Sequence, residues 1–276
     1  MNSRNTKCNY KNHLKRVLIT GVSRGIGKAI AKKFLQNEYE VFGTFCSSKE
    51  SAYELISEYG IDKVNLFGPY DFTNLNDIQQ MIEKLKMYTF DTIICSAGMF
   101  SERNDFQDFE IEEFDKIMHC NFYSQLMLTI GLQENIHCGG SIILMSSNDA
   151  DTGAYASLSY TISKSSIRSL MKCLTVNFGK KNVRVNSVSP GAIDTDMNTP
   201  EQIEISPIFT PLNRVGTPNE VAQVVYFLAS DEANFINGVD LLIDGGASAT
   251  SVLLKAEAVP NFSKALREYA TLERYS

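Results

Sequence analysis

The sequence predicts an α/β protein with one Rossmann-type domain, a doubly wound parallel sheet of about seven strands with helices on both faces. Two observations carry this prediction. Short apolar runs rich in β-branched residues alternate with longer segments of helical periodicity, as in repeated strand-helix-strand units. A glycine-rich turn also joins the first such run to the first helical segment, where the chain must reverse tightly.

The elements follow one another without a linker rich in proline, glycine or serine, so the simplest outcome is one sheet with right-handed crossovers. The predicted strands are Arg16–Thr20, Glu40–Phe45, Lys63–Gly68, Asp91–Cys95, Ser141–Ser146, Asn182–Ser187 and Asp240–Ile243. The predicted helices are Gly25–Gln36, Lys49–Tyr59, Asn74–Tyr88, Ile111–Ile136, Ser157–Gly179 and Pro218–Ser230. We therefore expect a flexible leader over residues 1–14, a catalytic domain over residues 15–250 and a C-terminal extension over residues 251–276.

The segment Asn198–Pro211 interrupts the alternation, because it holds three prolines and mixed polarity. This composition is typical of a mobile loop with one short helix. Parallel sheets bind ligands at the carboxyl ends of their strands, and this loop follows the sixth strand there. It is a candidate substrate lid. The extension carries an amphipathic stretch, Phe262–Tyr275, which fits packing on a neighbouring subunit, a border of the active site, or a surface helix without function.

Composition argues against several classes of function. The net charge of −6 gives no reason to expect binding to nucleic acid or to an anionic membrane. The leader has neither the apolar core of a signal peptide nor the length of a membrane span. The six cysteines lack a paired motif, and the three histidines are dispersed, which argues against a metal site. We expect a cytoplasmic protein in a reducing compartment.

The turn Thr20–Gly27 has the spacing GxxxGxG and opens a helix. Glycines let the backbone approach a pyrophosphate, whose charge a helix N-terminus stabilises. A turn that binds no ligand is the alternative interpretation. The candidate cofactor-binding residues of the turn are Gly21, Ser23, Arg24, Gly25, Ile26 and Gly27.

The end of the second strand indicates which dinucleotide binds. An NAD site usually places an acidic residue there, whereas a 2′-phosphate requires positive charge. Here the strand ends in Thr44–Ser48 without an acid, and Arg24 lies in the turn. NADP(H) is therefore favoured over NAD(H), the alternative for Arg24 being a solvated surface arginine. Asp71 is a candidate for binding the adenine amino group, although acids at strand ends are often turn formers.

Tyr160 and Lys164 stand four residues apart at the start of a predicted helix, so they share one face about 5–6 Å apart. An adjacent ammonium and a positive nicotinamide would lower the tyrosine pKa toward neutrality and make it a usable proton donor or acceptor. Ser147 closes the fifth strand thirteen residues before Tyr160 and brings a hydroxyl to the same edge. This serine would hold the substrate oxygen while Tyr160 exchanges its proton.

Taken together, these motifs resemble the short-chain dehydrogenase/reductase family from about Lys15 to Gly246. The family's usual Asn-Asn before Ala97-Gly98 is Cys95-Ser96 here. The matching residues are the turn Thr20–Gly27, Ala97, Gly98, Asn121, Ser147, Tyr160, Lys164 and the run Pro190, Gly191, Ala192, Ile193, Asp194, Thr195.

The resemblance implies roles for several of these residues. Asn121 would support a proton-relay water, Lys164 would also bind the nicotinamide ribose, and Ile193 with Thr195 would hold the carboxamide. From the residues alone, Asn121 is equally compatible with a buried polar group, and Thr195 with a turn cap. Ala97 and Gly98 would let backbone approach the cofactor.

Within the family the pattern is most similar to 3-oxoacyl-[acyl-carrier-protein] reductases, in Arg214–Pro218 and Phe227–Ala233. An acidic carrier protein needs a basic patch, yet Phe122–Ser141 holds no lysine or arginine. The leading hypothesis is therefore reduction of a small carbonyl compound, or oxidation of a secondary alcohol, in a specialised biosynthetic pathway. The carrier-protein reductase is the alternative enzyme, and a non-catalytic dinucleotide sensor the alternative of another class. Apolar helix surfaces favour a homodimer or homotetramer.

Overall fold

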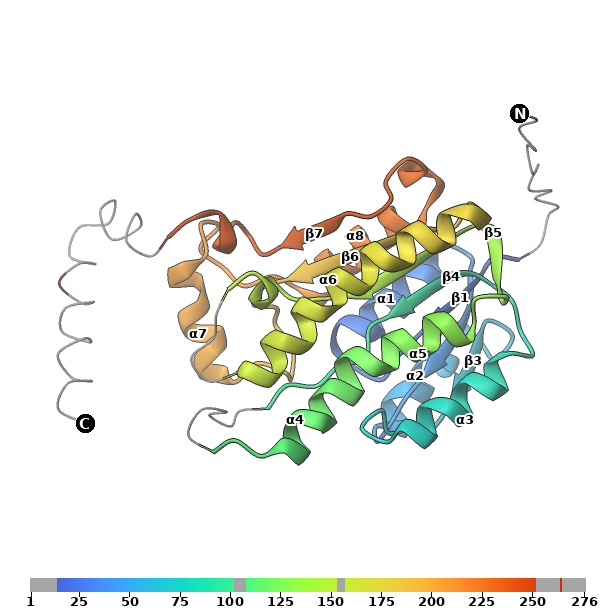
Figure 1. The fold of residues 1–276 in the computed structure, drawn as a ribbon, viewed down its shortest axis with the longest axis horizontal. Helices are drawn as coiled ribbons and strands as arrows, with labels where there is room; N and C mark the ends of the chain where they lie inside the picture. The colour runs from blue at the N-terminus through green and yellow to red at the C-terminus, as the bar shows by residue number, and fades with distance from the viewer. Residues whose placement is uncertain (1–13, 102–107, 153–156, 252–263, 265–276) are drawn as a thin grey trace.

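The computed structural model describes residues 14–101, 108–152, 157–251 and 264 (Figure 1). The predicted leader and almost all of the C-terminal extension, including the stretch Phe262–Tyr275, lie outside the described residues. No helix in the described part of the chain is long and apolar enough to cross a membrane.

Seven parallel strands form one sheet in the order β3-β2-β1-β4-β5-β6-β7, which confirms the predicted fold class. The chain adds β2 and β3 on one side of β1, and then adds β4 to β7 on the other side. The carboxyl ends of β1 and β4 therefore open a crevice at this switch point. The strands are β1 (Arg16–Ile19), β2 (Glu40–Thr44), β3 (Val64–Phe67), β4 (Phe90–Cys95), β5 (Ile136–Met145), β6 (Arg184–Pro190) and β7 (Asp240–Ile243).

Helices cover both faces of the sheet, and each face has its own buried apolar cluster. One cluster joins α1, α2 and α8 to the strands, and the other joins α3, α5 and α6 (Figure 1). The α-helices are α1 (Gly25–Gln36), α2 (Lys49–Tyr59), α3 (Leu75–Leu85), α4 (Ile111–Met118), α5 (Ser124–Gly131), α6 (Leu158–Phe178), α7 (Pro200–Phe209) and α8 (Pro218–Ala229).

The single helix predicted over Ile111–Ile136 is wrong in two places. A π-helical segment, η1 (His119–Tyr123), separates α4 from α5, and the chain leaves the helix after Gly131. Asn135 explains the second break, because its side chain donates to the Lys86 and Tyr88 carbonyls at 2.9 and 2.7 Å. Its own carbonyl accepts the Phe90 N–H, so β5 starts at Ile136, five residues earlier than predicted.

The loop predicted over Asn198–Pro211 contains the short helix α7, which lies at the end of the sheet where β6 and β7 finish (Figure 1). Thr199 and Gln202 form a capping box, and Pro200 occupies the first turn, where it costs no hydrogen bond. These residues fix where the helix begins.

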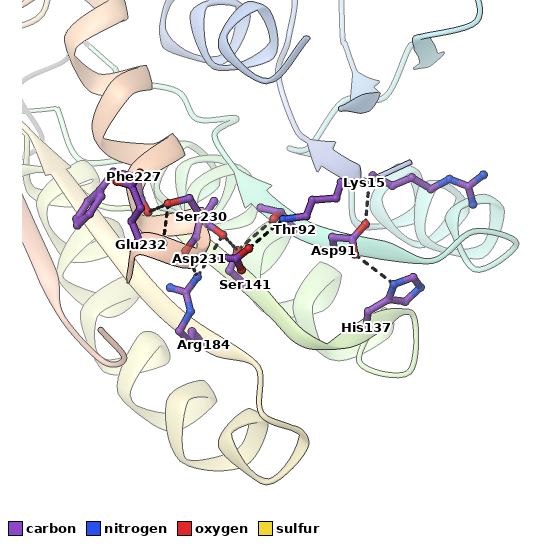
Figure 2. A network of polar contacts seen from close by, with 12 residues as sticks. Lys15, Asp91, Thr92, His137, Ser141, Arg184, Phe227, Ser230, Asp231 and Glu232 are labelled. Atoms are coloured by element: carbon purple, nitrogen blue, oxygen red, sulfur yellow. Dashed lines mark hydrogen bonds and ion pairs between the residues drawn. The ribbon is translucent and has the colours of Figure 1, made fainter. Parts of the chain in front are cut away.

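Polar contacts tie the opposite, amino ends of the strands together (Figure 2). Arg184 at the start of β6 donates to the carbonyls of Leu228, Ala229 and Ser230, which are the last carbonyls of α8 and the residue after it. A cation at a helix C-terminus is stabilised by the helix dipole. This edge is therefore occupied by structural contacts, and the carboxyl edge is left for ligands.

The cysteines are not all reduced. Cys46, Cys95, Cys120 and Cys173 are free thiols, whereas Cys138 is disulfide-bonded. Free thiols and a disulfide occur together, so the cysteines do not decide the compartment, and the reducing compartment expected from the sequence stays a prediction.

Candidate active site

A cavity of about 690 Å³ lies along the carboxyl edge of the sheet and brings together nearly all of the predicted site residues. The glycine-rich turn lines one part, the serine, tyrosine and lysine predicted to be catalytic line another, and the segment after β6 lines a third. The predicted site residues that line it are Gly21, Ser23, Arg24, Gly25, Ile26, Gly27, Asp71, Ala97, Gly98, Ser147, Tyr160, Lys164, Pro190, Gly191, Ile193 and Thr195.

The turn after β1 is built closely against the rest of the fold. Gly21 has a φ of +76°, and its N–H and that of Val22 both donate to the Thr44 carbonyl at the end of β2. A Cβ on Gly27 would lie 2.1 Å from the Gly21 carbonyl oxygen. Only glycine therefore allows α1 to start this close to β1, so the amides of its first turn lie at the cavity.

The N-terminus of α1 is suited to an anion. Its N-cap residue, Arg24, makes no side-chain cap, and the first four amides of a helix have no partner within it. Gly25, Ile26 and Gly27 of this first turn line the cavity. The combination of unpaired amides and the helix dipole favours a phosphate group.

The end of β2 carries no acidic residue at the cavity, as the sequence predicts. The Arg24 side chain is 69% exposed beside it and pairs with Asp196 at 3.7 Å. Asp71 lines the cavity, but its carboxylate accepts the N–H and hydroxyl of Thr73 at 2.9 and 2.8 Å. Asp71 therefore acts as a turn former, which is the alternative interpretation given above. It also lies at the cavity.

Ser147, Tyr160 and Lys164 converge as predicted. Ser147 follows β5, and its side chain lies close enough to the Tyr160 hydroxyl to lower the pKa of the tyrosine. Lys164 lies one turn after Tyr160 on α6, with its Nζ 5.5 Å from the tyrosine ring centroid, and donates to the Met145 carbonyl at 3.1 Å. Phe100 packs edge-on against Tyr160, with ring centroids 5.2 Å apart. The pair of hydroxyls therefore faces the cavity from a fixed position.

The pKa values of the two helix residues move in opposite directions. Burial raises the pKa of Tyr160 to about 12, against the lowering effect of the Ser147 hydrogen bond. Burial also lowers the pKa of Lys164 to about 8. Desolvation of the phenolate therefore dominates in the protein alone, and the lowering of the Tyr160 pKa by Lys164 together with a bound nicotinamide stays a prediction.

The low pKa of Lys164 predicts a pH-dependent stability. The unfolded chain holds the Lys164 proton up to about pH 10.5 and the folded chain only to about pH 8, so folding becomes more favourable as pH rises between these values. From pH 7 to pH 9.5 we expect the free energy of unfolding of the wild type to gain about 2 kcal/mol relative to Lys164→Met. Urea denaturation of both proteins at the two pH values measures this. A constant difference would contradict the buried, low-pKa lysine.

Asn121 does not line the cavity but positions the backbone that does. It is fully buried in the π-helical segment η1. Its Oδ1 accepts the Met99 N–H at 2.8 Å, and its Nδ2 donates to the Met99 carbonyl at 2.9 Å and to Ser163 at 3.0 Å. These bonds hold the chain segment at Met99, which follows Gly98 beside Lys164. The buried polar interpretation accounts for every contact seen here, and the proton-relay water stays a prediction.

The segment after β6 contains residues that the sequence did not single out. Asn198 donates to the Ile193 carbonyl at 2.6 Å, whereas the Thr195 hydroxyl reaches the same oxygen only at 3.5 Å. Gln202, Ser206 and Phe209 of α7 line the cavity, which agrees with the predicted position of a lid. The signal for α7 was present in the run Thr199–Gln202, which reads as a capping box with proline in the first turn.

A family model described as Enoyl-(Acyl carrier protein) reductase matches residues 21–248, a range that includes Ser147, Tyr160, Lys164 and the segment after β6. The chain belongs to the short-chain dehydrogenase/reductase family. This confirms the resemblance seen in the sequence.

Known proteins and solved structures are similar to this short-chain dehydrogenase/reductase over most of its length. Versicolorin reductase of Emericella nidulans is 35% identical over 87% of this chain and 97% of its own length. Trihydroxynaphthalene reductase of Pestalotiopsis fici is 30% identical over 83% of this chain and 88% of its own. A short-chain dehydrogenase from Burkholderia cenocepacia, solved in complex with NADP, has a TM-score of 0.80 at 26% identity, covering 84% of this chain and 97% of its own.

Proposed function

We propose that this short-chain dehydrogenase/reductase is an NADP(H)-dependent oxidoreductase that reduces the carbonyl group of a small molecule, or oxidises the secondary alcohol, in a specialised biosynthetic pathway. The observation that carries the proposal is the meeting of Ser147, Tyr160 and Lys164 at one cavity, which the first turn of α1 also lines. The reductase relatives and the neighbour solved with NADP support it.

The residues present fit a dinucleotide phosphate. The glycine-rich turn and the first turn of α1 would hold the pyrophosphate, Arg24 the 2′-phosphate, and the segment Pro190–Thr195 the nicotinamide end. When bound, the nicotinamide supplies or accepts the hydride. The protein's own part is to hold the substrate oxygen at Ser147 and to deliver a proton from the Tyr160 hydroxyl.

Two other functions are supported less well. A carrier-protein reductase would need basic groups on α5, and the nearby Lys181 is already paired with Glu134 at 2.6 Å. A non-catalytic sensor would have no use for a serine, tyrosine and lysine that meet at one edge of the cavity. A small-molecule reductase accounts for both features.

The test of the cofactor is a calorimetric titration of the wild type and Arg24→Ala with NADPH and with NADH. We expect NADPH to bind more tightly than NADH, and Arg24→Ala to weaken NADPH at least about tenfold while NADH changes little, since one charge-assisted contact is lost. Lys33→Ala, at the far end of α1, is the matched control. If neither nucleotide binds the wild type, the proposed function is wrong.

We further propose a homodimer or homotetramer in the cytoplasm. Exposed apolar side chains on η1, α5 and α6 support an association across these helices, among them Tyr123, Ile130, Ile162 and Val176. Sedimentation equilibrium of the purified protein measures the subunit number.

A further inference from the structure

Asp149 places a carboxyl group at the part of the cavity where a carbonyl substrate must bind. It lies in the short helical turn η2 (Asn148–Ala150), directly after Ser147, and lines the cavity. Its N–H donates to the Ser147 Oγ at 3.2 Å, and its carboxylate is hydrogen-bonded to the Ser147 side chain. None of the roles assigned above uses this carboxyl group.

The charge of Asp149 has no cationic partner within the part of the chain that the structure describes. Of the cavity's described basic side chains, Arg24 pairs with Asp196, and Lys164 donates to the Met145 carbonyl. Burial raises the pKa of Asp149, as expected for a carboxylate without a cation beside it. Its charge in turn raises the pKa of Tyr160, so its field reaches the phenol.

We propose that Asp149 determines substrate specificity by binding a hydroxyl or ammonium group on the carbon next to the reacting carbonyl. The inference rests on the proposed function, because it takes Ser147 and Tyr160 as the groups that hold the carbonyl oxygen. It adds the chemical class of the substrate: an α-hydroxy or α-amino ketone, in preference to a plain ketone or an α-keto acid.

The position of the carboxylate decides which part of the substrate it contacts. A carbonyl oxygen at Ser147 lies about 3 Å from the serine Oγ, and Asp149 accepts from that same hydroxyl group. A donor on the adjacent carbon therefore comes within hydrogen-bond reach of Asp149. This substrate donor also takes the place of the Ser147 hydroxyl as the hydrogen-bond donor to the carboxylate. The single Ser147 proton is then left for the substrate oxygen.

Charge sets the order among substrates. An ammonium donor makes a charge-assisted bond with the carboxylate, which is about twice as strong as a neutral one. A neutral hydroxyl gains one hydrogen bond to a charged acceptor. A substrate carboxylate at this position would meet a like charge with no described cation to offset it, and such juxtaposition is strongly unfavourable.

Four phenyl ketones that differ only next to the carbonyl test this: acetophenone, α-hydroxyacetophenone, α-aminoacetophenone and benzoylformate. Steady-state NADPH consumption gives kcat and KM for each with the wild type, Asp149→Asn and Asp149→Ala. We expect wild-type kcat/KM for the amino and hydroxy ketones to exceed that for acetophenone by about tenfold or more. We expect kcat/KM for benzoylformate to lie below that for acetophenone by about tenfold or more.

The variants separate charge from hydrogen bonding. Asp149→Asn should lose the preference for the amino ketone, keep part of that for the hydroxy ketone, and gain benzoylformate activity. Asp149→Ala should lose both preferences, measured as the kcat/KM of each ketone relative to that of acetophenone with the same variant. Asp151→Asn is the matched control, because it removes the same charge two residues away and outside the cavity lining. It should leave the ranking of the ketones unchanged.

Two results would overturn the inference in distinguishable ways. If Asp149→Asn changes all four ketones by one common factor, or if the wild type shows no preference, Asp149 does not contact the substrate and only this inference is wrong. If the wild type binds NADPH but reduces none of the four ketones, the proposed reduction itself is overturned, and this inference with it.

Discussion

Tyr160→Phe should lower kcat for ketone reduction by about 10³-fold and leave NADPH affinity within about twofold, because it removes the proton donor and almost nothing else. With a pKa of about 12 the Tyr160 hydroxyl is protonated at neutral pH, so the resting protein is prepared for reduction. The ring keeps its edge-on contact with Phe100, and the backbone carbonyl of residue 160 keeps its bond from Ser163.

The measurement is single-turnover NADPH oxidation with α-hydroxyacetophenone, beside a calorimetric NADPH titration. Tyr59→Phe is the matched control, since it removes an exposed hydroxyl away from the cavity, whose described partners are Gln36 at 3.3 Å and Glu58. It should retain wild-type rates. A Tyr160→Phe protein that keeps more than about a tenth of the wild-type rate would show that another group supplies the proton.

The centre of the sheet was predictable because its inner strands are buried on both faces and therefore appear as continuous apolar runs. β4 is buried at every position, and all but one residue of β1 is buried. The predicted boundaries differ from the structure mainly where contacts between distant segments decide. β5 begins at Ile136 because the side chain and carbonyl of Asn135 bind residues 86–90, and no local periodicity reveals such a contact.

The site was predictable where chemistry requires a particular residue type at a fixed spacing. The turn glycines, Tyr160 and Lys164 belong to this group, because a backbone approach and a one-turn separation leave few alternatives. Asn198 and Asp149 could not be found in the same way. They act from irregular segments, and only the folded backbone brings them to Ile193 and Ser147.

Tyr160 also shows what a sequence leaves out of electrostatics. Spacing predicts an ammonium close to the phenol, but it does not show how deeply both groups are buried. Burial penalises each charged form, and it is the largest cause of the pKa shift of both residues. A pKa direction therefore needs the structure, even where the pair of residues is read correctly from the sequence.

Gly27→Ala should destabilise the protein by about 3 kcal/mol and weaken NADPH binding at least about tenfold. Alanine is a better helix former than glycine by about 1 kcal/mol, so helix propensity alone predicts stabilisation. The new Cβ would lie 2.1 Å from the Gly21 carbonyl oxygen and 2.9 Å from its carbon, which are backbone atoms that cannot rotate away. The whole turn must move, and the amides that would bind the pyrophosphate move with it.

Gly179→Ala is the matched control, because its φ is −56° and a Cβ there would meet nothing within 4 Å. It should be neutral or stabilise by about 0.5 kcal/mol through the unfolded state. Urea denaturation and NADPH titration of both variants separate the two effects. Equal stability of the two variants would mean that α1 can shift away from β1, and unchanged NADPH affinity in Gly27→Ala would mean that the pyrophosphate does not bind at this turn.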